Sequence, residues 1–204
     1  MAADTLINDF ELPFQLYDVL GTEHLTEHPK FAEHSRETFD AVLDTANKIA
    51  TNLFLPHNHV ADKNEPQFDG KKVSMISDVK VAFDAFRESG FIAGRYSFDD
   101  GGMQLPETVM TAVAGYFMAA NPSTTAYPFL TTAAINVISH FASDEIKNAF
   151  MPRMLTGEFT GTMALTEPHA GSSLADIKTT AVKQDDGSYR VKGSKIYISA
   201  GDHE

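Results

Sequence analysis

Two short segments of the chain carry residue types that could bind a ligand. Residues 163–172 read MALTEPHAGS, and residues 192–201 read KGSKIYISAG. Each segment runs from alternating apolar residues into hydroxyls and a glycine. A strand that ends at Thr166 offers backbone groups and a hydroxyl, and Gly171 after it permits close backbone approach. These residue types supply hydrogen bonds to a bound group, so the two segments are the predicted binding surface.

The composition excludes several kinds of site. The chain of 204 residues has no cysteine, which rules out disulfides, thiolate catalysis and Cys-ligated metal. Its net charge of -12, with Lys and Arg scattered along the chain, argues against nucleic-acid binding. The N-terminal residues lack the basic and apolar pattern of a secretory signal, and no run approaches the roughly 18 apolar residues that span a membrane. We therefore expect a cytoplasmic protein with no nucleic-acid partner and no membrane span.

Helical periodicity dominates the first three quarters of the chain, and we expect about six helices in a domain over residues 1–158. Apolar residues from Phe39 to Leu53 recur on one helical stripe, and Pro56 should end that helix. Gly90 stands where a helix C-terminus favours a left-handed residue, and Ser143 has the character of an N-cap. The other predicted helices cover residues 76–89, 106–120, 123–141 and 143–157.

After Gly157 the pattern becomes that of β-structure. The predicted strands cover residues 159–165, 176–183, 189–192 and 195–199. An Asp-Gly step at Asp186 between the second and third runs predicts a hairpin. The expected fold is therefore mainly α. A helical domain is followed, over residues 159–204, by the first strands of a β-barrel domain that the chain leaves incomplete.

The two segments, their place after a helical domain and the hairpin between them resemble the N-terminal half of an acyl-CoA dehydrogenase. Residues 90–94, 101–106 and 143–147 also resemble landmarks of that family. The region before Ala41 is similar to the branch that contains methylthiopropanoyl-CoA dehydrogenases. The resemblance implies an FAD-dependent oxidoreductase that acts on an acyl-CoA thioester. It also implies a homo-oligomer that passes electrons to an electron-transfer flavoprotein or a similar acceptor.

The resemblance assigns ligand contacts to residues of both segments. The predicted flavin-binding residues are Met163, Leu165, Thr166, Tyr197, Ile198 and Ser199. Among them, Ser199 would lie near flavin N5, the atom that accepts hydride. Ser172 is the predicted substrate-binding residue, where the pantetheine arm or the cofactor's phosphates would pass.

The reaction of the family removes the α-proton of the acyl-CoA with a glutamate and transfers a β-hydride to the flavin. The resemblance places this base beyond the chain, and Glu167 belongs to the binding loop. We therefore expect no catalytic residue within these 204 residues. Two positions depart from the family pattern, since Ser173 replaces an aspartate and Gln104 replaces a glycine, and both bear on the substrate contacts.

Histidines offer an alternative site. His57 and His59 lie close in sequence, and His24 and His28 have helical spacing, so either pair could ligate a metal. No surrounding pattern of hydrogen-bonding partners supports such a site. We therefore expect no metal.

The remaining alternatives concern a methionine cluster and the function as a whole. Met103, Met110 and Met118, with Phe117, are expected in the helix core rather than in the wall of a substrate site. Two other functions remain open. The chain could be a non-catalytic assembly or dimerisation fragment, or it could belong to a member of the same family with an oxidase or DNA-damage-response role.

Overall fold

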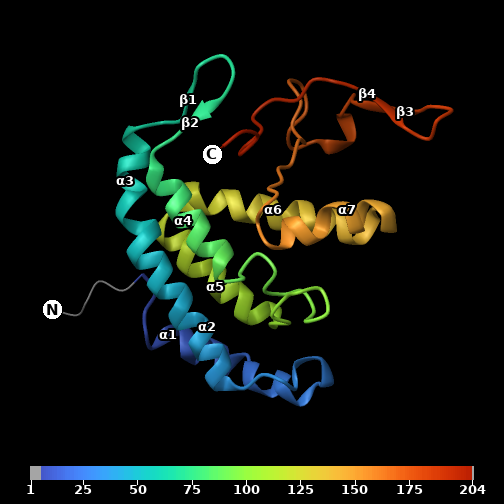
Figure 1. Cartoon of the computed structure of the whole chain (residues 1–204). Coiled ribbons are helices and arrows are strands. Elements are labelled where there is room, and N and C mark those ends of the chain that lie inside the picture. Colours follow the sequence, from blue (N-terminus) through green and yellow to red (C-terminus); the bar gives the residue numbers. More distant parts are fainter. Residues whose placement is uncertain (1–5, 204) are drawn as a thin grey trace.

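The computed structural model describes residues 6–203 and confirms the predicted mainly helical fold (Figure 1). The α-helices are α1 (Glu11–Pro13), α2 (Arg36–Ile49), α3 (Leu55–Lys63), α4 (Ser77–Glu88), α5 (Glu107–Ala120), α6 (Pro122–Phe141) and α7 (Asp144–Leu155). π-Helical segments cover Phe14–Val19 and Ala50–Phe54, and 3-10 turns cover Thr22–Glu27, Pro29–Phe31 and Leu174–Asp176. The strands are β1 (Gln67–Phe68), β2 (Val73–Ser74), β3 (Thr180–Lys183) and β4 (Tyr189–Lys192).

The helices form one body from which the C-terminal quarter projects. Helix α2 packs against α5, α4 packs against α6, and α6 lies beside α7. The chain leaves α7, rises from the helical body and ends in the β3–β4 hairpin and a returning segment (Figure 1). That segment returns to the β1–β2 hairpin, where the Val73 N–H donates to Asp202 Oδ2 at 2.8 Å. The two predicted binding segments therefore lie over helices, not inside a completed sheet.

The prediction that Pro56 ends the first long helix is wrong. Helix α2 continues through the π-helical segment Ala50–Phe54 into α3. Inside this segment the Leu55 N–H donates to Ala50 O, five residues earlier, which widens the turn just before the proline. Pro56 then lies in the first turn of α3, where its missing N–H removes little. The helical path therefore continues to Lys63.

Local signals place most other helix ends as predicted. Gly90, after α4, has a left-handed φ of 77°, which is accessible to glycine at little cost. Ser143 caps α7, since its Oγ accepts a hydrogen bond from the Ile146 N–H at 3.4 Å. Helix α5 begins at Glu107, so Pro106 is its N-cap and not its first helical residue.

An aromatic cluster forms the centre of the helical core. Phe117 of α5 is fully buried, and its ring centroid lies 4.8 Å from those of Phe54 and Phe86 and 5.9 Å from that of Phe91. All three pairs meet edge to face, an arrangement that adds to the burial of apolar area. The cluster therefore joins the π-helical segment, α4 and α5.

The methionines only partly follow their prediction. Met110 is buried in the core, and the half-buried Met103 packs against it. Met118 is 47% exposed, so its prediction as a core residue is wrong. It follows the buried Phe117 directly on α5, and adjacent residues on a helix point in different directions.

The β-structure agrees with the prediction only at its hairpin. Strands β3 and β4 pair antiparallel, with Lys183 opposite Tyr189, around a turn in which Gly187 has a φ of 86°. Strand β3 begins later than predicted, because Leu174–Asp176 forms a 3-10 turn and the N–H groups of Lys178 and Thr179 donate to Glu167. A short hairpin of β1 and β2, which the sequence pattern did not predict, joins α3 to α4.

Two predicted strands are wrong. Over residues 159–165 the chain passes against α6, where the Gly161 N–H donates to Thr131 Oγ1 at 3.1 Å instead of to another strand. Over residues 195–199 alternation is broken by Tyr197, whose left-handed φ of 56° is incompatible with an extended strand. Contacts with neighbouring segments, not local propensity, decide both conformations.

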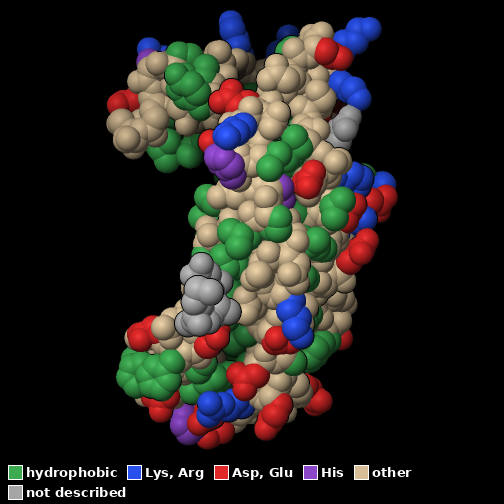
Figure 2. All heavy atoms as spheres, turned by 90° about the vertical axis from the view of Figure 1, so that its left-hand side faces the viewer, with side chains coloured by type: hydrophobic (Ala, Val, Ile, Leu, Met, Phe, Trp, Pro, Cys, Tyr) green, Lys and Arg blue, Asp and Glu red, His purple; other side chains and the backbone are tan. Residues whose placement is uncertain are grey.

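The surface mixes both signs of charge. On the face drawn in Figure 2, Lys and Arg side chains are interspersed with acidic ones, and hydrophobic side chains are spread among them. Among residues 6–203, no helix combines the length and apolar character needed to cross a bilayer.

Candidate functional site

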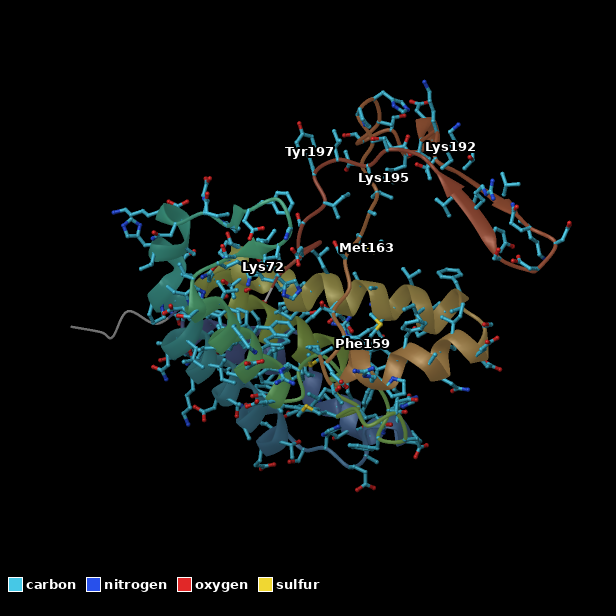
Figure 3. The ribbon with its side chains drawn as sticks, turned by 45° about the horizontal axis from the view of Figure 1, so that its top comes forward. Lys72, Phe159, Met163, Lys192, Lys195 and Tyr197 are labelled. Carbon is cyan, nitrogen blue, oxygen red and sulfur yellow. The ribbon has the colours of Figure 1, made fainter. Side chains whose placement is uncertain are left out.

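The structure brings the two predicted binding segments side by side. The Ile196 N–H donates to Thr166 O at 3.0 Å, and the Thr162 hydroxyl donates to Ser199 O. Both segments lie above α6, with Met163 and Tyr197 on neighbouring stretches of chain (Figure 3). Residues far apart in the sequence therefore form one surface.

The side chains of this surface leave apolar groups in contact with solvent. Tyr197 is 87% exposed, Leu165 43% and Met163 38%, while Ile198 is half-buried. Exposed apolar side chains that gather on two adjoining segments are typical of a surface that a ligand or another protein covers. The backbone of Tyr197 is left-handed, and its ring points into solvent.

Hydroxyls complete the surface. Thr166 is half-buried, and Ser199 is exposed. Neither side-chain hydroxyl makes a hydrogen bond to another described residue, so both can donate to a ligand. Apolar side chains with unpaired hydroxyls at the edge match what a flat ring with polar edge atoms requires. The residues present therefore fit the ring of a flavin. Ser172, the last residue of the first segment, is exposed.

Beneath the surface, a buried carboxylate joins three stretches of chain; we call it and its partners the Glu167 cluster. The Glu167 side chain is only 2% exposed. Its oxygens accept hydrogen bonds from the Lys178 N–H at 2.8 Å and the Thr179 N–H at 3.0 Å. They also accept from the Thr179 hydroxyl at 2.5 Å and from Lys195 Nζ at 2.9 Å. His169 Nε2 lies 3.5 Å from Oε2.

These donors favour the ionised carboxylate. The Thr179 hydroxyl contributes most, followed by the Lys178 N–H and Lys195, and together they hold the pKa of Glu167 well below its ordinary value of 4.5. A carboxylate so held is a weak proton acceptor, and its oxygens already accept hydrogen bonds from the protein.

Acid should loosen the Glu167 cluster. Because the folded-state pKa lies below the unfolded value, the carboxylate contributes its full stability only above about pH 4.5. That contribution falls as the pH drops toward the folded-state pKa. In an NMR titration, the amide shifts of Lys178 and Thr179 should stay constant down to about pH 4.5 and change only below it. The Glu167→Gln variant should lack the transition. A shared midpoint above pH 4.5 would contradict the assignment.

The two departures from the family pattern occupy defined positions. Gln104 has a left-handed φ of 51°, a conformation that glycine adopts more easily. Its side-chain Nε2 donates to Lys30 O at 2.6 Å, which ties the loop to the N-terminal region. Ser173 Oγ donates to Asp176 Oδ2 at 2.7 Å, so a carboxylate lies near the position where the family has one.

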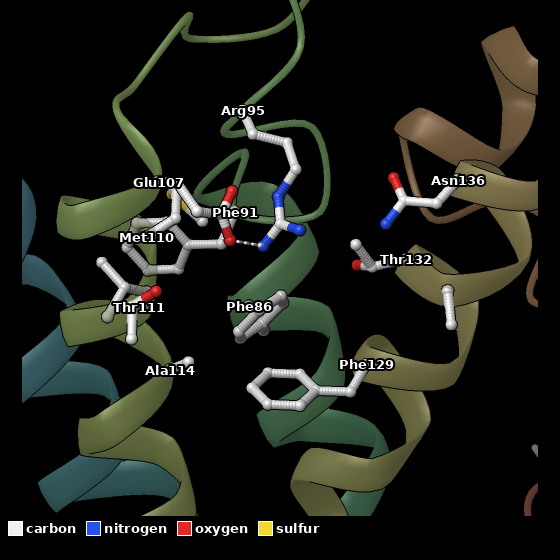
Figure 4. Close-up of a pocket in the computed structure, with 12 residues that line it drawn as sticks. Phe86, Phe91, Arg95, Glu107, Met110, Thr111, Ala114, Phe129, Thr132 and Asn136 are labelled. Carbon is white, nitrogen blue, oxygen red and sulfur yellow. Dashed lines mark ion pairs between the residues drawn. The ribbon is translucent and has the colours of Figure 1, made fainter. Parts of the chain in front are cut away.

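A cavity of about 300 Å³ lies between α4, α5 and α6 (Figure 4). Its wall is mainly apolar, and its larger apolar side chains are Phe86, Phe91, Met110 and Phe129. At one end, Arg95 pairs with Glu107 across 3.4 Å. Thr132 of α6 lines the cavity, whereas its neighbour Thr131 accepts a hydrogen bond from Gly161. Helix α6 therefore lies between the cavity and the chain that leads to the binding surface.

The histidines do not assemble a metal site. His57 is buried, with Nδ1 bonded to Leu53 O at 2.7 Å and Nε2 to Thr124 Oγ1 at 2.8 Å, so both ring nitrogens are already used. His24 Nδ1 lies 3.1 Å from Glu27, in a 3-10 turn instead of an α-helix. Within residues 6–203, no group of three or more His, Asp or Glu side chains is arranged to hold a metal.

Sequence reasoning missed the partners of Glu167. Lys195, Lys178 and Thr179 were not predicted as site residues, although they fix the loop that carries Thr166. One signal was available for Lys195, which is a cation directly before the apolar run at Ile196. The bonds from the Lys178 N–H and the Thr179 N–H come from backbone groups, which no side-chain pattern reveals.

Comparisons with known proteins agree with this architecture. A family model described as acyl-CoA dehydrogenase, N-terminal domain, matches residues 36–158, and one described as acyl-CoA dehydrogenase, middle domain, matches residues 162–203. The chain is 32% identical over 192 residues to 3-methylmercaptopropionyl-CoA dehydrogenase of Ruegeria pomeroyi. That match covers 91% of this chain and 33% of the relative, so the chain spans about a third of the relative's length.

Solved structures show the same fold. Butyryl-CoA dehydrogenase from Megasphaera elsdenii superposes with a TM-score of 0.67 at 20% identity, over 81% of this chain and 41% of that one. An acyl-CoA dehydrogenase from Bacillus anthracis, solved in complex with FAD, gives a TM-score of 0.62 at 24% identity, over 82% of this chain and 27% of that one. The matched helical region, the matched segments around Thr166 and Ser199, and the shared fold together show that this chain belongs to the acyl-CoA dehydrogenase family.

Proposed function

We propose that this chain is the flavin-binding N-terminal part of an FAD-dependent acyl-CoA dehydrogenase. The observation that carries the proposal is the pairing of the two segments, which places the unpaired hydroxyls of Thr166 and Ser199 beside the exposed apolar side chains of Met163, Leu165 and Tyr197. The family match and a related structure solved with FAD support the choice of cofactor. Residues 1–158 form the helical domain in this proposal, and residues 159–204 begin the β domain.

Each part of the surface has a role in this proposal. Thr166 and Ser199 would donate hydrogen bonds to the polar edge of the ring, and the apolar side chains would cover the ring and exclude water. Ser172 would contact the pantetheine arm or a phosphate. Bound FAD supplies the hydride acceptor of the dehydrogenation.

Glu167 is not the base in this proposal, because donors from the protein already engage both of its carboxylate oxygens. We propose that the base lies outside residues 1–204, and that the electrons pass to an electron-transfer flavoprotein or a similar acceptor. We also propose that the enzyme is a homo-oligomer and that it is located in the cytoplasm.

Replacing Ser199 with valine should weaken FAD binding in the complete polypeptide to which this chain belongs. The change removes a hydroxyl that donates to a ring on which charge accumulates, and such a bond is worth about 1.5–3 kcal/mol. The dissociation constant for FAD should rise by roughly tenfold or more, as measured by flavin fluorescence titration. Ser194→Val, at an exposed serine of the same segment, is the matched control. Equal affinities for both variants would count against the placement of Ser199 at the flavin.

The 204-residue chain by itself should show no dehydrogenation of acyl-CoA substrates above background. With no base in reach, α-proton removal loses the roughly 10²–10⁴-fold contribution of general-base catalysis and the remaining substrate contacts. Turnover is measured with an artificial electron acceptor and a series of acyl chain lengths. Robust activity would locate the base within residues 1–204. A purified chain without visible flavin absorbance would instead favour the assembly-module alternative.

A further inference from the structure

We propose that Glu167 is a positioning residue that holds the two flavin-contacting segments in one register; this inference rests on the proposed function. The sequence pattern gives Glu167 no role beyond membership of the loop. In the structure it is instead the buried connection between the loop at Thr166 and the segment that carries Ser199.

The Glu167 carboxylate is enclosed by donors from three stretches of chain. The backbone of Glu167 is itself fixed, because its N–H donates to Ala170 O at 2.9 Å and its carbonyl accepts from the Ala170 N–H at 3.1 Å. From this closed turn, its side chain reaches Lys178 and Thr179 on one side and Lys195 on the other. Removing the charge would leave several of these donors without an equal acceptor beside a buried side chain.

Lys195 carries the connection to the second segment. Its Nζ donates to Glu167 Oε1 at 2.9 Å and to Leu165 O at 2.8 Å. The next residue, Ile196, donates its N–H to Thr166 O at 3.0 Å. Three consecutive residues of the first segment therefore bind the second segment: Lys195 bonds to Leu165 and Glu167, and Ile196 bonds to Thr166. A shift of either segment by one residue would break all of these bonds together, so the arrangement specifies a single register.

That register sets the geometry of the proposed flavin surface. The segment leaves Ile196 through the left-handed Tyr197 and reaches Ser199, whose carbonyl accepts from the Thr162 hydroxyl. The Lys195–Glu167 pair lies directly before this stretch and is largely shielded, with side-chain exposures of 21% and 2%. Breaking a shielded pair from one side leaves the partner charge uncompensated. The relative placement of Thr166 and Ser199 should therefore loosen when Glu167 is neutralised.

The test is FAD binding by the complete polypeptide carrying Glu167→Gln. We expect the dissociation constant for FAD to rise by at least about tenfold, the loss of one well-placed charge-assisted hydrogen bond. The bound flavin should also lose the resolved shape of its visible bands, because a looser site admits water. Glu158→Gln is the matched control, since the exposed Glu158 carboxylate pairs with Arg153 and not with either segment. This control should leave affinity and spectrum unchanged.

Lys195→Met and the double variant test the pairing itself. If Glu167 acts through Lys195, the double variant should raise the dissociation constant less than the product of the two single effects. Thr179→Val removes one hydroxyl donor, while Glu167 keeps its bonds to the Lys178 N–H, the Thr179 N–H and Lys195. If circular dichroism shows that Glu167→Gln does not fold, Thr179→Val tests the role of Glu167 in its place. Thr179→Val should then raise the dissociation constant severalfold and broaden the flavin bands.

The outcomes separate the inference from the proposed function. A wild-type polypeptide that binds no FAD would overturn the proposed function, and the inference with it. A wild type that binds FAD, together with a Glu167→Gln or Thr179→Val variant of unchanged affinity and spectrum, would overturn the inference alone. Strictly multiplicative effects of the Glu167 and Lys195 variants would also overturn it, because independent residues cannot hold a shared register.

Discussion

Replacing Phe117 with alanine should lower the free energy of unfolding by about 3–5 kcal/mol, the usual cost of truncating a fully buried phenylalanine. Phe117 is 0% exposed and meets three other aromatic rings, so its removal leaves a cavity that helices from several parts of the chain would have to close. The loss is measured by urea denaturation followed by far-ultraviolet circular dichroism.

Phe141→Ala is the matched control for this experiment. Phe141 is the same residue type at the end of α6, but it is 85% exposed. Its replacement should change the free energy of unfolding by no more than about 0.5 kcal/mol. If the two variants shift the denaturation midpoint equally, the cluster around Phe117 is not the centre of the core.

Replacing Gly193 with alanine should push Thr179 away from the second of the two segments proposed to contact the flavin. An added Cβ at this position would lie 2.0 Å from Thr179 Oγ1 and 3.0 Å from the Thr179 Cα, so the backbone at Gly193 or at Thr179 must move. Overpacking of this kind costs about 1–3 kcal/mol. Because Thr179 is a donor to Glu167, we expect FAD affinity to fall by roughly tenfold or more, together with faster hydrogen exchange at Lys178 and Thr179.

Gly201→Ala provides the comparison at a glycine with room for a methyl group. There an added Cβ would meet its nearest atom, Ile198 Cγ2, at an ordinary 3.8 Å. This variant should keep the exchange rates of Lys178 and Thr179 at their wild-type values. A Gly193→Ala protein with wild-type exchange and wild-type FAD affinity would show that the close approach to Thr179 is not required.

Helix ends could be predicted from the sequence because their signals are local. The hydroxyl of Ser143 reaches an N–H three residues on, and Gly90 adopts a left-handed φ that few other residues accept, so neighbours in the chain decide both. Pro56 shows the limit of local signals. Its effect depended on the π-helical widening of the turn before it, which is a property of the folded helix and not of proline.

The sequence by itself determined the family, the mainly helical fold, the hairpin at Gly187 and the two segments that carry the proposed site. These follow from local periodicity, turn chemistry and motif residues. Only the tertiary structure decided that Tyr197 turns left-handed instead of continuing a strand, and that Glu167 is buried among donors. The physical reason is that these depend on contacts between residues distant in the chain. The bonds from Lys178, Thr179 and Lys195 exist only when three segments meet at one carboxylate.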